Sequence, residues 1–200
     1  MRLTIIACEI LFREISWCVS RSENVVDVRF LRKGLHDLGE KEMVAALQKE
    51  IDSVEPERSE AILLGYGLCN NGIRGLRSKK SKLVVPRAHD CITLLLGSKE
   101  RYRQYFDANP GTYFRSTGWA ERDVPAEQKG AYTQLGLLPT YEEYVKKYGE
   151  DNAKFLMETM GSWEKNYSRM AYVDMGIPEF PDYSENAKKE AEEKNGGLKQ

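Results

Sequence analysis

The sequence predicts an α/β protein with a Rossmann-like, mostly parallel sheet flanked by helices, and a small helical C-terminal extension. Two observations predict this fold. Short apolar runs rich in Ile, Leu and Val recur without polar alternation, as strands buried on both faces require. Amphipathic segments separate several of these runs, which is the order of elements in a doubly wound sheet. We expect a single α/β domain over residues 1–178, then a charged helix and a frayed tail over 179–200.

The first half of that sheet is predicted from two strand and helix pairs. Leu3–Ala7 is the first strand, and Ile10–Val19 follows as a helix with apolar residues at helical spacing, Cys18 among them. Val25–Leu31 is the second strand. Glu40–Ile51 is an amphipathic helix, because its apolar residues lie on one face.

Two further strands are predicted at Ala61–Leu64 and Lys82–Val85, joined by a polar elbow over residues 65–72 and a basic surface turn. After the second of these strands comes an apolar segment that breaks at Gly97. Ser98 is then placed to cap a helix over Lys99–Asp107.

The chain becomes irregular after Gly111. Thr112–Arg115 reads as an edge strand and Thr117–Trp119 as a turn, and we interpret the whole segment 112–136 as a lid that closes over the site with Trp119. Long segments without periodicity inside a compact domain are uncommon and are often functional lids. The alternative is a surface excursion with Trp119 packed on the core.

The C-terminal part is predicted to contain helices and one more strand. Thr140 caps a helix through Tyr148, a second helix runs over Asp151–Trp163, and Met170–Val173 is a strand. A charged helix begins near Ser184.

Composition excludes several classes of protein. Charged residues make up 30% of the 200 residues and the net charge is -1, so no overall field recruits nucleic acid or anionic lipid. The apolar run Leu3–Ala7 is too short for a signal-peptide core, and no run could span a bilayer. The four cysteines are therefore expected to be thiols or ligands in a cytoplasmic protein, and not a disulfide framework.

The reactive side chains follow the ends of the predicted strands. If the sheet is parallel, they share its carboxyl edge, where ligands bind in such sheets. Thiolates with imidazole suit zinc, and three thiolates also suit an iron–sulfur cluster. We predict a metal site, with zinc as first choice, and its ligands are Cys8, Cys69, Cys91 and either His36 or His89.

Two other interpretations of the cysteines stay open. Free cysteines often simply pack in a core. Alternatively, Cys69 is a reactive thiol near a helix N-terminus, which lowers its pKa, with His89 as its base.

The polar neighbours of these residues suggest catalytic and binding roles. Arg87 is a planar donor suited to a carboxylate or phosphate, and Asp90 would orient the imidazole of His89. Glu9 is an acid–base group or forms an ion pair with Arg87. A tight turn at Gly65, Tyr66 and Gly67 is a candidate cofactor-binding segment, although the glycines at 65, 67 and 72 do not form the GxGxxG pattern.

The chain also resembles a known family. The resemblance covers roughly Leu3–Asp174, and this family is domain-of-unknown-function family 1638, found mainly in anaerobic archaea and bacteria and often near genes of corrinoid-dependent methyltransferases. The motifs that carry it are Ala7-Cys8-Glu9, Leu35-His36, Tyr66-Gly67-Leu68-Cys69, Pro86-Arg87-Ala88-His89-Asp90-Cys91-Ile92, Leu96-Gly97-Ser98, Pro110-Gly111-Thr112-Tyr113 and Gly118-Trp119. The resemblance implies a place in one-carbon metabolism.

These observations together predict a metal-dependent enzyme, a transferase or lyase, that acts on a small anionic or methylated metabolite. The alternative is a non-catalytic module that binds a metal, an iron–sulfur cluster or a corrinoid protein. The expected partners are a small-molecule ligand and a corrinoid protein or methyltransferase, with no nucleic acid and no membrane. The strand order and the oligomeric state do not follow from the sequence.

Overall fold

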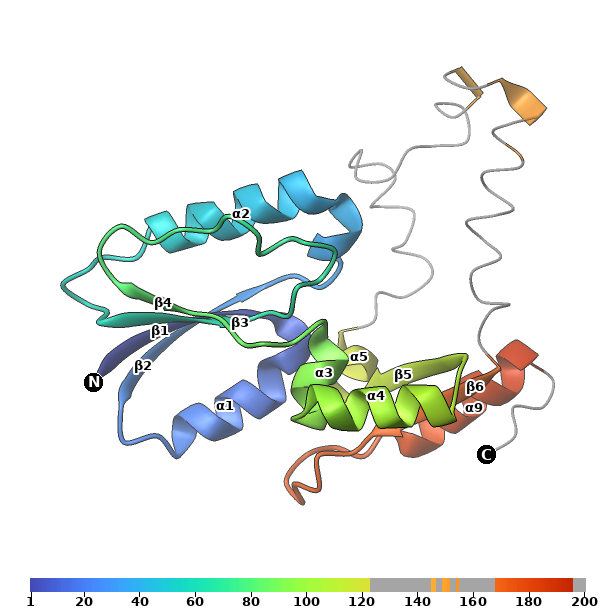
Figure 1. The fold of residues 1–200 in the computed structure, drawn as a ribbon. Helices are drawn as coiled ribbons and strands as arrows, with labels where there is room; N and C mark the ends of the chain where they lie inside the picture. The colour runs from blue at the N-terminus through green and yellow to red at the C-terminus, as the bar shows by residue number, and fades with distance from the viewer. Residues whose placement is uncertain (123–144, 147–148, 152–153, 155–167, 196–200) are drawn as a thin grey trace.

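The computed structural model describes residues 1–122, 145–146, 149–151, 154 and 168–195. These residues form a four-stranded sheet and a two-stranded sheet, each with helices packed around it. The four-stranded sheet and its flanking helices form one half of Figure 1, and the two-stranded sheet forms the other.

The main sheet is entirely parallel. Its strands are β1 (Arg2–Cys8), β2 (Val25–Leu31), β3 (Ala61–Gly65) and β4 (Lys82–Val84), and they stand in the order β2-β1-β3-β4. The chain therefore builds outward from β1 to β2 and then crosses back to the other side of β1. This reversal puts a topological switch point between β1 and β3, at whose carboxyl ends open α/β sheets bind their ligands.

Helices cover both faces of this sheet, as a doubly wound fold requires. The first connection is η1 (Glu9–Leu11) with α1 (Phe12–Ser20), and the second is η2 (Leu35–Leu38) with α2 (Glu40–Asp52). The helices α1 and α2 lie on opposite faces (Figure 1). The chain from residue 66 to residue 81, which follows β3, contains no helix.

Two hydrophobic clusters meet at the carboxyl edge of the sheet. The first lies under α2 and contains Ile6, Met43, Leu47, Ile51, Ile62, Leu64 and Tyr66. The second contains Ile10, Leu11, Ile92, Leu95 and Val173. Cys8, the last residue of β1, packs against both clusters and so stands at their junction.

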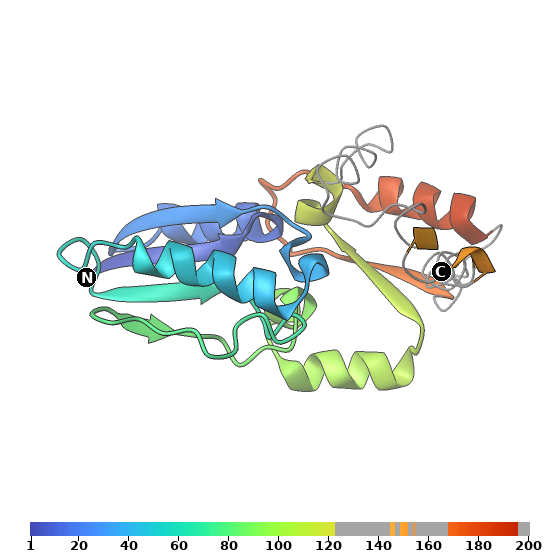
Figure 2. The same ribbon diagram turned by 90° about the horizontal axis from the view of Figure 1, so that it is seen from above.

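The remaining elements lie beyond the carboxyl edge of the main sheet (Figure 2). Helix α3 (Cys91–Leu96) begins at Asp90, whose side chain accepts from the Thr93 amide, and Ser98 caps α4 (Lys99–Ala108) in the same way. Such side-chain caps satisfy amide groups that the first helical turn leaves unpaired.

A second, smaller parallel sheet completes the structure. It pairs β5 (Thr112–Ser116) with β6 (Arg169–Val173), with α5 (Thr117–Glu121) directly after β5. Helix α9 (Ser184–Asn195) packs on this unit through Ala187 and Ala191, and its Glu190 accepts from the Arg115 guanidinium. The predicted charged helix at the C-terminus is therefore part of the packed structure.

The fold class is confirmed, and three details differ from the predictions. Thr117–Trp119 lies in a short helix and not in a turn, and the described part of the lid segment, residues 112–122, is strand and helix. Its stability comes from β6, a pairing partner more than fifty residues away that local periodicity does not reveal. Cys18, placed on the apolar face of the first helix, is exposed.

Most of two predicted helices, Thr140–Tyr148 and Asp151–Trp163, lies outside the described residues. The same holds for residues 123–136 of the predicted lid. Within the described part of the chain, no helix is both long and apolar enough to cross a membrane.

Candidate functional site

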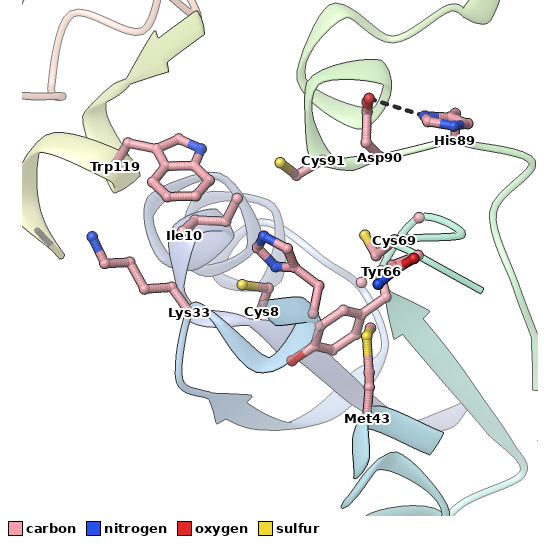
Figure 3. A pocket seen from close by; sticks show the side chains of 14 residues that line it. Cys8, Ile10, Lys33, Met43, Tyr66, Cys69, His89, Asp90, Cys91 and Trp119 are labelled. Atoms are coloured by element: carbon pink, nitrogen blue, oxygen red, sulfur yellow. Dashed lines mark hydrogen bonds and ion pairs between the residues drawn. The ribbon is translucent and has the colours of Figure 1, made fainter. Parts of the chain in front are cut away.

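A cavity of about 210 Å³ lies at the carboxyl edge of the main sheet, at the switch point between β1 and β3. Three cysteines and both histidines of the chain line it: Cys8, His36, Cys69, His89 and Cys91. The residues of the predicted turn, Gly65, Tyr66 and Gly67, and Asp90 line it as well. Figure 3 shows the labelled members of this set around one space.

Backbone pairing beyond the strands brings the cysteine-bearing loops together. The amide of Leu68 donates to the Ala88 carbonyl and the amide of Cys69 to the His89 carbonyl, both at 2.9 Å. The ladder between β3 and β4 is thereby resumed past the strand ends. Gly67 permits this approach, because a Cβ there would lie 2.6 Å from the Asp90 backbone nitrogen.

Cys69 begins a left-handed turn that non-glycine residues rarely adopt. Its φ is 40°, and Asn70 and Asn71 follow with φ of 57° and 64°. The Gly72 amide closes the turn on the Cys69 carbonyl at 3.2 Å. Left-handed backbone costs about 1–2 kcal/mol per L-residue, less for asparagine, and such strain clusters at functional sites. The turn therefore uses folding energy to place Cys69 in the cavity wall.

Burial keeps the three thiols neutral in the metal-free protein. It raises the pKa of Cys8 to about 11 and that of Cys91 to about 12, and it also raises the pKa of Cys69. The thiols further raise one another's pKa, which means that charges on neighbouring sulfurs would interact. The expectation that a helix N-terminus lowers the pKa of Cys69 is wrong, because no helix follows β3 and desolvation dominates.

The two histidines stand in different environments. The side chain of His89 is 77% exposed, and its Nδ1 lies 3.1 Å from Asp90 Oδ2. The other carboxylate oxygen, Oδ1, accepts from the Thr93 amide at 2.8 Å. Asp90 thus holds the His89 ring at the cavity rim while it caps α3. His36, in η2, is half-buried.

Two of the predicted catalytic residues do not line the cavity. Arg87 is exposed and is not among the lining residues, so the prediction that it faces the pocket is wrong. Glu9 accepts from the Lys33 amide at 2.9 Å with Oε1, and its Oε2 lies 3.8 Å from Arg122. The alternative ion pair between Glu9 and Arg87 is therefore wrong too. The partner of Glu9 comes from the end of α5, which sequence proximity could not indicate.

Several lining residues were not predicted, and one of them could have been. Lys33 follows β2 directly, as His36 does, so the rule that selected His36 also selects Lys33. Its ammonium nitrogen lies 5.2 Å from the centre of the Trp119 ring. Ile10, Met43 and Asn70 also line the cavity and carried no distinguishing signal.

Two polar atoms in the cavity wall are buried without a hydrogen-bond partner among the described residues: the Tyr66 hydroxyl and the Trp119 indole Nε1. Burial also raises the pKa of Tyr66, so its hydroxyl keeps its proton. Native proteins rarely leave buried donors unsatisfied, and each such group calls for an explanation. A molecule or ion bound in the cavity would explain both groups, because it could accept their hydrogen bonds.

The donor atoms of the cavity suit a metal centre better than their spacing does. Three thiols and two imidazoles are a donor set that zinc prefers, so the chemistry of the lining fits the ion. Across the described residues, however, no three Cys, His, Asp or Glu side chains stand close enough together to hold a metal as they are placed. The residues thus share a cavity without forming a closed coordination sphere.

Fold and site together define a class: a doubly wound α/β protein with a thiol-lined cavity at the switch point of its sheet. The chain belongs to the family described as protein of unknown function DUF1638, whose model matches residues 30–196. The predicted family is therefore confirmed, although the match begins after the Ala7-Cys8-Glu9 motif and extends beyond Asp174. The chain has no significant match among curated proteins or solved structures.

Proposed function

We propose that this protein binds zinc through Cys8, Cys69 and Cys91, and that it uses the site to act on a small molecule held in the cavity. One observation carries the proposal: three thiols, at the end of β1 and in the segments that follow β3 and β4, line one cavity at the switch point. Packing alone rarely needs three cysteines at one edge, whereas thiolate ligands from separate loops are a common way to build a zinc site.

The fourth ligand in this proposal is His36. The choice rests on burial, because the His89 side chain is 77% exposed at the rim, while His36 is half-buried in the cavity wall. Each buried thiol would lose its proton to solvent as the metal binds, because only the thiolate is a ligand. Once bound, zinc would supply a Lewis acid or activate a thiol for methyl transfer.

The cavity sets limits on the ligand. A volume of about 210 Å³ lies below the range of pockets that hold drug-sized molecules, so the ligand is small. The buried Tyr66 hydroxyl would donate to a polar atom of that ligand, as a member of the predicted cofactor-binding turn. His89, oriented by Asp90 at the rim, would act as the acid–base group.

This arrangement supports an enzyme, a transferase or lyase, more than a binding module, because a cavity lies beside the ligands. The family resemblance supports a place in one-carbon metabolism in the cytoplasm, where thiols stay reduced, with a corrinoid protein or methyltransferase as partner.

The test is the metal content of protein purified without oxygen. We expect one zinc per chain and no visible absorbance. Cys8→Ser, Cys69→Ser and Cys91→Ser should each lose most of the metal, while Cys18→Ser, an exposed thiol on α1, should keep it. Arg87→Lys should also keep it, because that side chain lies outside the cavity lining.

Two results would redirect the proposal. A broad brown absorbance, lost in the same three variants, would replace zinc by an iron–sulfur cluster. Equal metal content in all four cysteine variants would refute a shared thiolate site.

A further inference from the structure

The indole N–H of Trp119 is a buried donor in the cavity wall. Its Nε1 is buried and, among the described residues, has no acceptor in good hydrogen-bond geometry. The indole nevertheless stands near the Cys91 thiol, since it counteracts part of the pKa increase that burial causes there. An indole nitrogen is a donor only, so neither a water-excluding apolar wall nor another donor can satisfy it. In Figure 3 the nitrogen side of the ring points toward the Cys91 sulfur, on the far side from Lys33.

Helix α5 holds the indole in this position and prevents it from finding an acceptor elsewhere. Gly118 lies directly on the first turn after β1, since a Cβ there would be 1.6 Å from the Ile10 carbonyl oxygen. Arg13 binds Glu121 through two nitrogens at 2.7–3.1 Å, and Arg122 faces Glu9 at 3.8 Å. The helix is thereby attached to α1 and to the end of β1 on both sides of Trp119.

A thiol is a poor acceptor for such a donor, but a metal-bound thiolate is a good one. Hydrogen bonds to ligand sulfurs orient the ligand and tune the metal in thiolate sites. Binding of a divalent cation by Cys91 would release the thiol proton to solvent and leave a negatively charged sulfur opposite the indole N–H. The buried donor would then gain the partner that its placement calls for.

We propose that Trp119 is a positioning residue for the metal site, whose indole N–H donates a hydrogen bond to the Cys91 sulfur when that sulfur is a metal-bound thiolate. This inference rests on the proposed function. It gives Trp119 a role within a fixed wall of the cavity, in place of the mobile lid that the sequence suggested.

Trp17 supplies a matched control. Its Nε1, on α1, is likewise buried with no hydrogen-bond partner in the described part of the chain, but Trp17 does not line the cavity. Arg21 instead stacks on its ring at 4.2 Å. Changing either tryptophan to phenylalanine keeps an aromatic ring and removes one buried N–H, so the two variants differ mainly in what that N–H faces.

The experiment compares wild type, Trp119→Phe and Trp17→Phe in metal binding. Zinc affinity is measured by competition with a chromophoric chelator, and cobalt(II) replaces zinc for spectroscopy. We expect Trp119→Phe to bind zinc about 10–100-fold more weakly, as loss of such outer contacts typically does. Its thiolate-to-cobalt charge-transfer band should move to longer wavelength, because a sulfur without the hydrogen bond gives up electron density more readily. Trp17→Phe should match wild type in both.

A second measurement needs only the wild-type fold. In an NMR spectrum of the indole N–H groups, assigned with the two variants, the Trp119 proton should move downfield on zinc addition while the Trp17 proton stays in place. If wild type binds zinc but the Trp119 signal does not move and Trp119→Phe keeps its affinity and spectrum, the inference is overturned and the proposed function stands. If wild type binds no metal, both the proposed function and this inference are wrong.

Discussion

Raising the pH is expected to destabilise the metal-free protein through its buried thiols. Desolvation raises the pKa of Cys8 from 9.0 to about 11 and that of Cys91 from 9.0 to about 12. Between pH 9 and these values the unfolded chain loses the thiol protons while the folded chain keeps them. Because the folded state then binds more protons, the free energy of unfolding falls with increasing pH.

The size of the effect follows from proton linkage. Each thiol that is neutral in the folded state and ionised in the unfolded state lowers the free energy of unfolding by about 1.4 kcal/mol per pH unit. The stabilising contribution is fully present below pH 9. It is lost for Cys8 as the pH approaches about 11, and for Cys91 as it approaches about 12.

Guanidinium unfolding from pH 8 to pH 11, without oxygen and with excess chelator, measures this loss. Lysines and tyrosines also titrate in this range. The informative quantity is therefore the difference in the free energy of unfolding between wild type and each variant. In Cys8→Ala and Cys91→Ala that difference should change by about 1.4 kcal/mol per pH unit above pH 9. In Cys18→Ala, which removes an exposed thiol, it should stay constant. Parallel curves for all four proteins would refute the argument that burial holds these thiols neutral.

Two further predictions concern the walls of the cavity. Gly118→Ala should lower the free energy of unfolding by about 3 kcal/mol, because its Cβ would overlap the Ile10 carbonyl and backbone atoms cannot move aside cheaply. Gly75→Ala is the control, because a Cβ there meets open space in the described structure and only the φ of +74° is unfavourable. It should lower the free energy of unfolding by only about 1 kcal/mol. Equal losses for the two variants in denaturant unfolding would contradict the close contact at Gly118. Tyr66→Phe should raise the free energy of unfolding by about 1 kcal/mol, since it removes a buried hydroxyl that has no partner within the described residues. A loss of stability in that variant, measured in the same way, would mean that the hydroxyl is already satisfied.

The first half of the fold was predictable because its information is local. The strands β1 and β3 are short, largely apolar runs, α2 has one apolar face, and Ser98 caps α4 within its own turn. The strand β4 was expected to be buried on both faces, but it is an edge strand with Lys82 and Val84 exposed. Once the sheet is parallel, residues that follow strands must gather at one edge. This is why Cys8, Cys69 and Cys91 could be assigned to one place without any spacing motif.

Tertiary structure decided the rest, because the deciding contacts join residues far apart in the chain. The pairing of β5 with β6 turns a segment without periodicity into a packed sheet, and the contact of Gly118 with Ile10 makes Trp119 a wall of the cavity. Arg87 and Glu9 are both charged, and each lies two residues past the end of its predicted strand, yet one is exposed and the other meets Arg122. Burial, which sets the pKa of each thiol, is a property of the whole packed neighbourhood, so no stretch of sequence could specify it.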